Sequence, residues 1–162
     1  MIILGVDPGL RVAGYALARK HGAKVTIFDY GDLTLSPKKT VAERVHTFFS
    51  FFEEKITQNN VSHIVLETPF LGKNAQSFLK LGYLRGVLLL LGQVHKADVL
   101  EFAPRTIKQA VTGYGHASKE QVAQTLMHLF PALKNLKKTV KQDVTDAIAI
   151  CMTGLYRINR HR

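Results

Sequence analysis

Acidic residues close two apolar segments of the sequence. Asp7 follows the apolar residues 2–6, and Glu67 ends the segment HIVLE at residues 63–67. If these segments are adjacent parallel strands, both carboxylates emerge at the same edge of a sheet. A charge this close to a core is costly unless a partner or a cation neutralises it. We therefore expect a divalent cation beside these two acids.

A second pair of acids, Asp143 and Asp146, lies in KQDVTDAIAI. Three residues apart on a helix, they share one face, and the apolar run beside them can bring that face to the sheet. Each acid also has a simpler explanation. Acids in the first turn stabilise a helix through its dipole, Asp7 can cap a turn, and Glu67 can pair with a lysine. Four acids at two strand ends and one helix start favour a shared site.

The ligand chemistry and the net charge point to the same activity. Oxygen ligands without a Cys or His cluster suit hard cations, so we expect Mg²⁺ or Mn²⁺ and not Zn²⁺. The chain has 22 Lys and Arg against 12 Asp and Glu, a net charge of +10, which favours a polyanionic partner, either nucleic acid or an anionic membrane surface. Acids that hold metals within a basic protein that holds phosphates are typical of two-metal phosphodiester hydrolysis.

Length and composition predict one soluble domain that fills residues 1–162. With 46% hydrophobic and 21% charged residues, the chain is neither disordered, collagen-like nor a coiled coil. The single cysteine, Cys151, is expected to be a buried core residue. No secretory signal is seen, and the longest apolar run, Val87 to Gly92, is far shorter than a membrane span. We expect a cytoplasmic protein without a membrane partner.

Hydrophobic periodicity predicts the elements that position these acids. Three consecutive strands should form an antiparallel meander, and later strands alternate with helices, which gives an α/β fold with a mixed sheet. The expected strands are 2–6, 12–18, 24–35, 63–67 and 98–102, and the expected helices are 40–57, 74–95, 105–112, 118–129 and 142–157. The segment SKEQ, from Ser118 to Gln121, has the form of a helix capping box.

Four segments, in order and spread over nearly the whole chain, resemble the RuvC family of bacterial Holliday junction resolvases: GVDPGLRVAGYA, ETPFLGKNAQSFLKLGYLRGV, FAPRTIKQAVTGYGHASKEQV and DVTDAIAI. The resemblance implies an RNase H-like fold, a five-stranded mixed sheet with helices on both faces. It also implies a homodimer that nicks two opposed strands of a four-way DNA junction symmetrically in recombination and repair. The implied cofactor is Mg²⁺, two ions per subunit with Mn²⁺ as a substitute, and an implied partner is the RuvA–RuvB branch-migration complex. Asp7, Glu67, Asp143 and Asp146 match the family's catalytic, metal-binding acids.

The resemblance also decides between two interpretations of several other residues. Phe70, after the TP of ETPF, can pack on its own core or stack on an unpaired base, and the resemblance favours stacking at the crossover. Lys108 and Lys119 flank TGYGHAS and can be solvated surface charges, but they match family lysines near the scissile phosphate. Lys119 is therefore counted among the catalytic residues. Arg11 and Lys73 complete the residues expected to contact DNA.

Two further segments have open roles. The helix predicted at 74–95 carries small residues that permit close packing, either on its own sheet or on a partner, and the resemblance favours the dimer interface; its residues of interest are Phe78, Gly82, Tyr83 and Gly86. The segment 131–142 is either a solvated loop or a contact for a DNA arm, through Lys134, Lys137, Lys138 and Lys141.

Three rival functions fit parts of the sequence. DPGLRVAG also fits the short phosphate loop of actin-like and sugar-kinase proteins, but those folds need two related domains and this chain has room for one. A non-catalytic DNA-binding module would have lost acids, and all four acids are present. A ribonuclease that cleaves RNA–DNA hybrids would use a similar acidic set, and only a comparison of substrates separates it from a resolvase.

Overall fold

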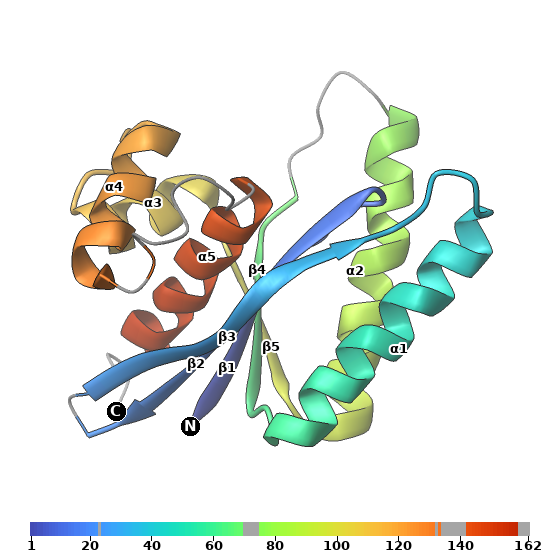
Figure 1. Ribbon diagram of the computed structural model, residues 1–162, viewed down its shortest axis with the longest axis horizontal. Coiled ribbons are helices and arrows are strands. Elements are labelled where there is room, and N and C mark those ends of the chain that lie inside the picture. The colour runs from blue at the N-terminus through green and yellow to red at the C-terminus, as the bar shows by residue number, and fades with distance from the viewer. Residues whose placement is uncertain (23, 70–74, 132, 134–141, 159–162) are drawn as a thin grey trace.

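A five-stranded mixed sheet forms the centre of the molecule. The computed structural model describes residues 1–22, 24–69, 75–131, 133 and 142–158. The sheet order is β3-β2-β1-β4-β5, from β1 (Ile2–Asp7), β2 (Val12–His21), β3 (Lys24–Thr34), β4 (His63–Glu67) and β5 (Asp98–Phe102) (Figure 1). The first three strands pair antiparallel, whereas β1, β4 and β5 run parallel. The predicted meander and mixed sheet are confirmed.

Helices cover both faces of this sheet, as predicted. α1 (Val41–Asn59) and α2 (Ala75–His95) pack on one face, and α3 (Pro104–Thr112), α4 (Lys119–Leu129) and α5 (Gln142–Ile158) lie on the other (Figure 1). Successive residues of a strand point to opposite faces. Leu4 and Val6 therefore enter the α1–α2 core, and Ile3 enters the α5 core.

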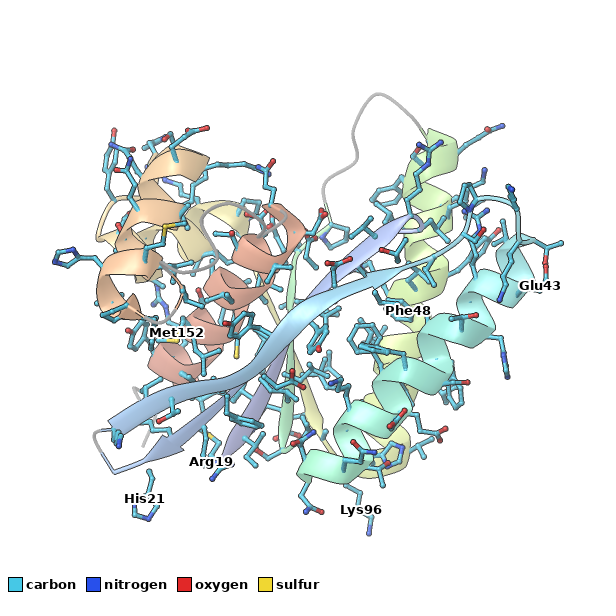
Figure 2. The ribbon with its side chains drawn as sticks, in the orientation of Figure 1. Arg19, His21, Glu43, Phe48, Lys96 and Met152 are labelled. Carbon is cyan, nitrogen blue, oxygen red and sulfur yellow. The ribbon has the colours of Figure 1, made fainter. Side chains whose placement is uncertain are left out.

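Each layer has its own buried core. Phe48 of α1 lies on one side of the sheet and Met152 of α5 on the other, both almost fully inaccessible to solvent (Figure 2). The rings of Phe48 and Phe52 pack with their centroids 4.5 Å apart. Cys151 is a buried free cysteine, as predicted. Burying a side chain of this size contributes about 1.5–3 kcal/mol, so the two cores hold the sheet rigidly between the helix layers.

Glycines let α5 lie directly against the strands. A Cβ at Gly5 of β1 would come within 2.5 Å of the Ala147 carbonyl oxygen, and one at Gly14 of β2 would collide with the Asp143 carbonyl oxygen. Any larger residue would push the helix away from the sheet. The close approach places the first turns of α5 beside the end of β1.

The hairpin of β2 and β3 is longer than expected. We expected β2 to end at residue 18, but pairing continues through Arg19↔Thr26 and Lys20↔Val25 to His21↔Lys24, and Gly22 turns the chain with φ +59°. Backbone hydrogen bonds can extend a ladder where side chains are polar and exposed. The polar sequence RKH therefore gave no hydrophobic alternation from which to predict the extension.

The α2 helix is unusual because much of its apolar surface is exposed. Among the described residues, it is the helix long and apolar enough to cross a membrane, judged by length and composition alone. Only 22% of the most apolar 18-residue stretch of this helix is buried. The longest uninterrupted apolar run of the sequence predicted no helix long enough to cross a membrane. It did not reveal this helix because Lys80 and Arg85 divide the helix's apolar residues into shorter runs. The described residues of the chain leave most of this apolar face of α2 uncovered.

Candidate active site

Asp7 and Glu67 lie side by side at one edge of the sheet. β1 and β4 are parallel, and Val6 pairs with Leu66, so each acid is the next residue along its strand. Ile3 of β1 and Val65 of β4 face α5, and Asp7 and Glu67 lie an even number of residues further along. Strand alternation directs both carboxylates to that same face. The predicted juxtaposition of these acids is confirmed.

The α5 helix brings its own acids to this edge. Asp143 lies in its first turn, and Gly14, over which that turn packs, pairs with Asp7 in the β1–β2 ladder. Asp146 lines a cleft of about 280 Å³ together with Asp7 and Glu67. Asp143 instead lines a neighbouring pocket on the side of the β1–β2 turn. The α5 pair therefore borders the site on two sides.

The cleft holds more negative charge than its surroundings compensate. Burial, followed by the charges of Asp146, Asp143 and Glu67, raises the pKa of Asp7 from an ordinary 3.8 to about 7. Burial and the charge of Asp146 also raise the pKa of Glu67, although Lys119, among other cations, opposes that rise. A pKa raised by burial and like charges is a mark of a functional site. A bound cation would relieve this repulsion.

Lys119 is a cation in direct contact with one of the acids. It begins α4 after the N-cap Ser118, which forms the predicted capping box with Gln121. The Lys119 Nζ donates to Asp146 Oδ2 at 3.1 Å. Partial burial disfavours the charged form, but the hydrogen bond to Asp146 and the nearby acids outweigh it and raise the pKa of Lys119. The lysine is therefore a fixed positive charge at the mouth of the cleft.

Lys108 joins the site from α3. Together with Glu67, Lys119 and Asp146, it lines an adjoining pocket of about 230 Å³. Arg11 is exposed and lies further away, in the pocket that Asp143 lines. Phe70 and Lys73 lie outside the described residues, as do Lys134, Lys137, Lys138 and Lys141 of the lysine-rich segment.

Arg85 is a residue of the site that sequence reasoning missed. From α2, its Nη1 donates to the Glu67 carbonyl oxygen at 2.8 Å and its Nη2 to Glu101 Oε1 at 2.6 Å. The side chain is only 12% exposed, so the guanidinium clamps the ends of β4 and β5 together. A lone arginine within the apolar stretch of α2 was the available signal. The spacing of the apolar residues predicts only a packing surface for this helix.

The donor set suits a hard divalent cation. All four acids offer oxygen ligands, and burial together with the charges of the other acids raises the pKa of Asp7 to about 7. As their side chains are placed, no three Asp, Glu, His or Cys residues among those described converge on one point that could hold an ion. The Lys119 ammonium contacts an Asp146 oxygen that such an ion would use. The oxygen ligands and the excess negative charge thus fit a metal ion, and these acids would have to move closer together to bind it.

Comparison with known proteins agrees with this geometry. The sequence profile of the crossover junction endodeoxyribonuclease RuvC family matches residues 3–154. The RuvC enzyme of Halothermothrix orenii is 39% identical over 99% of this chain and 96% of its own length. The enzyme of Pelodictyon phaeoclathratiforme is 41% identical over 97% of this chain and 81% of its own.

Solved structures show the same fold. Thermus thermophilus RuvC in complex with a Holliday junction substrate superposes with a TM-score of 0.88 and 25% identity, covering 99% of this chain and 96% of that one. The yeast mitochondrial Holliday junction resolvase shares the fold with a TM-score of 0.71 at 16% identity, covering 99% and 81%. The predicted RNase H-like fold is confirmed. With a profile match over residues 3–154 and these relatives, the chain belongs to the RuvC family of crossover junction endodeoxyribonucleases.

Proposed function

We propose that this chain resolves four-way DNA junctions by paired, symmetric nicks in two opposed strands, in recombination and repair. The observation that carries the proposal is the cleft that Asp7, Glu67 and Asp146 line together with Lys119, within a chain of net charge +10. Acids that attract a metal and basic residues that attract phosphates then serve one substrate. Family membership supplies the junction as that substrate.

The acids would hold two Mg²⁺ ions per subunit, for which Mn²⁺ would substitute, with Asp143 reaching the site from its neighbouring pocket. When bound, the metal supplies an activated water and stabilises the leaving oxygen. Lys119 would move from Asp146 towards the scissile phosphate, since a metal ion competes for the same carboxylate. Arg85 would keep the Glu67 backbone in register with β5 throughout.

DNA contacts would surround the cleft. Lys108 lies next to Lys119 and suits a phosphate of the cleaved strand, and Arg11 suits one on the Asp143 side. We assign a phosphate contact to Lys73 and a stacking role to Phe70, which would gain roughly 1–3 kcal/mol from a base only where a junction exposes one. Basic residues would then give general affinity for DNA, and stacking would select the junction.

The exposed face of α2 suits a two-fold dimer interface. Leu79, Tyr83 and Leu90 are 46–60% exposed at helical spacing along it. A Cβ at Gly82 or Gly86 would meet no atom within 4 Å, so these glycines face outwards instead of the chain's own sheet. Exposed apolar stripes of this kind mark interaction surfaces. A second copy related by a two-fold axis would cover the stripe and give the two active centres that symmetric nicking needs.

The remaining assignments rest on the family alone. We assign the RuvA–RuvB branch-migration complex as a partner and the cytoplasm as the location of the enzyme.

The apolar length of α2 offers a membrane as the alternative to a second copy. Flotation with anionic vesicles, compared with light scattering of the free protein, separates these two uses of the helix.

The test of the proposal compares three substrates at equal concentration in Mg²⁺: a four-way junction, a plain DNA duplex and an RNA–DNA hybrid. Cleavage of the junction alone, at related positions in two opposed strands, is the expected result. Preferential cleavage of the hybrid would instead make the chain a ribonuclease with the same acidic set.

A further inference from the structure

A basic pocket lies next to the acidic cleft and is not part of it. The pocket has a volume of about 740 Å³, and three cations line it, together with Leu10, Leu81 and Asp143: Arg11, Arg44 and Lys80. They come from three separate elements: Arg11 from the β1–β2 turn, Arg44 from the start of α1 and Lys80 from α2. Figure 1 shows these elements gathered at the same end of the molecule. The convergence therefore depends on the tertiary fold and not on one run of basic sequence.

These cations, Arg11, Arg44 and Lys80, form no salt bridge with any residue that the structure describes. Asp143 is the acid that lines the pocket, and it belongs to the catalytic set, where metal would compete for it. Like charges brought together without a counterion repel one another, and an anion in the pocket would relieve that repulsion.

Arg44 is anchored in a position from which it can bind such an anion. Its Nη1 donates to the Leu10 carbonyl oxygen at 3.1 Å, which ties α1 to the β1–β2 turn. Its Nε is buried and has no hydrogen-bond partner among the residues that the structure describes. A buried N–H without an acceptor is costly, and the guanidinium offers five donors in a fixed planar arrangement. The bond to Leu10 uses one of these donors, and the partly exposed side chain can present its other Nη donors to a ligand oxygen in the pocket.

We propose that this pocket binds a backbone phosphate of the junction strand as it leaves the active site on the Asp143 side, and that Arg44 and Lys80 are its binding residues alongside Arg11. The inference rests on the proposed function. A phosphodiester matches the observations because arginine binds its oxygens in bidentate fashion, and lysine adds a point charge. Since Asp143 borders both this pocket and the acid set, a phosphate here fixes the position of the strand relative to the cleaved bond.

The experiment measures how junction affinity depends on salt. Each phosphate contact adds about 0.7 to 0.9 to the slope of log K against log salt concentration. Binding of a labelled four-way junction is measured in EDTA from 50 to 200 mM NaCl for the full chain and for Arg44→Gln and Lys80→Gln. Each variant should lower the slope, by at most about 0.7 to 0.9 because the pocket holds one phosphate, and should weaken binding several-fold at low salt. EDTA makes the result independent of cleavage, so a chain that binds in this way but never cuts a junction would refute only the proposed function.

The matched control is Lys24→Gln. Lys24 is exposed and pairs with His21 at the far tip of the β2–β3 hairpin, which Figure 2 shows at the opposite end of the molecule from Glu43, the neighbour of Arg44. This control should leave the slope unchanged. Lys80 is exposed, so its variant tests the pocket even if loss of the Arg44 hydrogen bond weakens folding. Two results would overturn the proposal. One is an unchanged slope for Lys80→Gln. The other is stabilisation of the protein by inorganic phosphate alone, while the two substitutions leave junction binding unchanged.

Discussion

The raised pKa of Asp7 makes the metal-free enzyme less stable as pH rises. The carboxyl has an ordinary pKa of 3.8 and one of about 7 in the fold, so folding favours its neutral form. That contribution to stability is fully present below pH 3.8 and is lost as pH rises through about 7. The difference of about three pKa units corresponds to roughly 4 kcal/mol of unfolding free energy at 1.36 kcal/mol per unit.

Asp7→Asn removes the charge and should therefore stabilise the metal-free protein at pH 8 by up to roughly 4 kcal/mol, or about 8–16 °C in Tm for a chain of this size. The gain should shrink towards zero at pH 4, where the wild-type carboxyl is already neutral. Urea unfolding of both proteins in EDTA between pH 4 and pH 8 measures this difference.

The control for this measurement is Asp98→Asn, which changes a carboxylate that is 81% exposed, at the start of β5 and away from the cleft. It should show no comparable gain at pH 8. Mg²⁺ should stabilise the wild type more than Asp7→Asn, because a ligand that binds only the folded state stabilises it. An Asp7→Asn protein that is less stable than wild type in EDTA at pH 8 would refute the electrostatic reasoning.

Three further substitutions test separate parts of the site. Lys119→Ala should slow single-turnover junction cleavage and change junction affinity little, because the Lys119 Nζ contacts an acid of the site. A loss of affinity alone would make Lys119 an ordinary DNA contact. Arg85→Ala removes two charge-assisted hydrogen bonds of about 1.5–3 kcal/mol each and should raise the Mg²⁺ concentration needed for half-maximal cleavage, with partial recovery in Arg85→Lys; an unchanged Mg²⁺ midpoint would limit Arg85 to stability. Gly86→Glu places a charge on the apolar face of α2 and should give monomers by light scattering, whereas a variant that stays dimeric would move the interface elsewhere.

The sequence predicted the elements and the placement of Asp7 and Glu67 well because both follow from local rules. Apolar runs and helical spacing located the strands and helices, and strand alternation then placed Asp7 and Glu67 on one face. Gly14 carries no such local signal. Its purpose is visible only once Asp143 of α5 is seen to pack over it, and nothing in the local sequence links residues so far apart.

The parts that sequence reasoning missed are tertiary contacts between polar residues. Arg85 reaches Glu67 and Glu101 across two strands, and Arg44 and Lys80 line one pocket only because α1 and α2 flank the β1–β2 turn. Periodicity reports which face of an element is apolar. It does not report where a long charged side chain ends, because such side chains extend several ångströms from the backbone.

The role of the acidic cleft can be tested in one comparison, between wild type and Asp7→Asn on a four-way junction labelled in two opposed strands. Single-turnover reactions in Mg²⁺ give the rates and the nick positions, and binding in EDTA gives the affinity. Wild type should nick both strands at symmetric positions. Asp7→Asn should bind the junction with similar affinity and cut it slower by about three orders of magnitude or more, since metal-assisted chemistry supplies several kcal/mol. Cleavage by Asp7→Asn at the wild-type rate would contradict the assignment of the site.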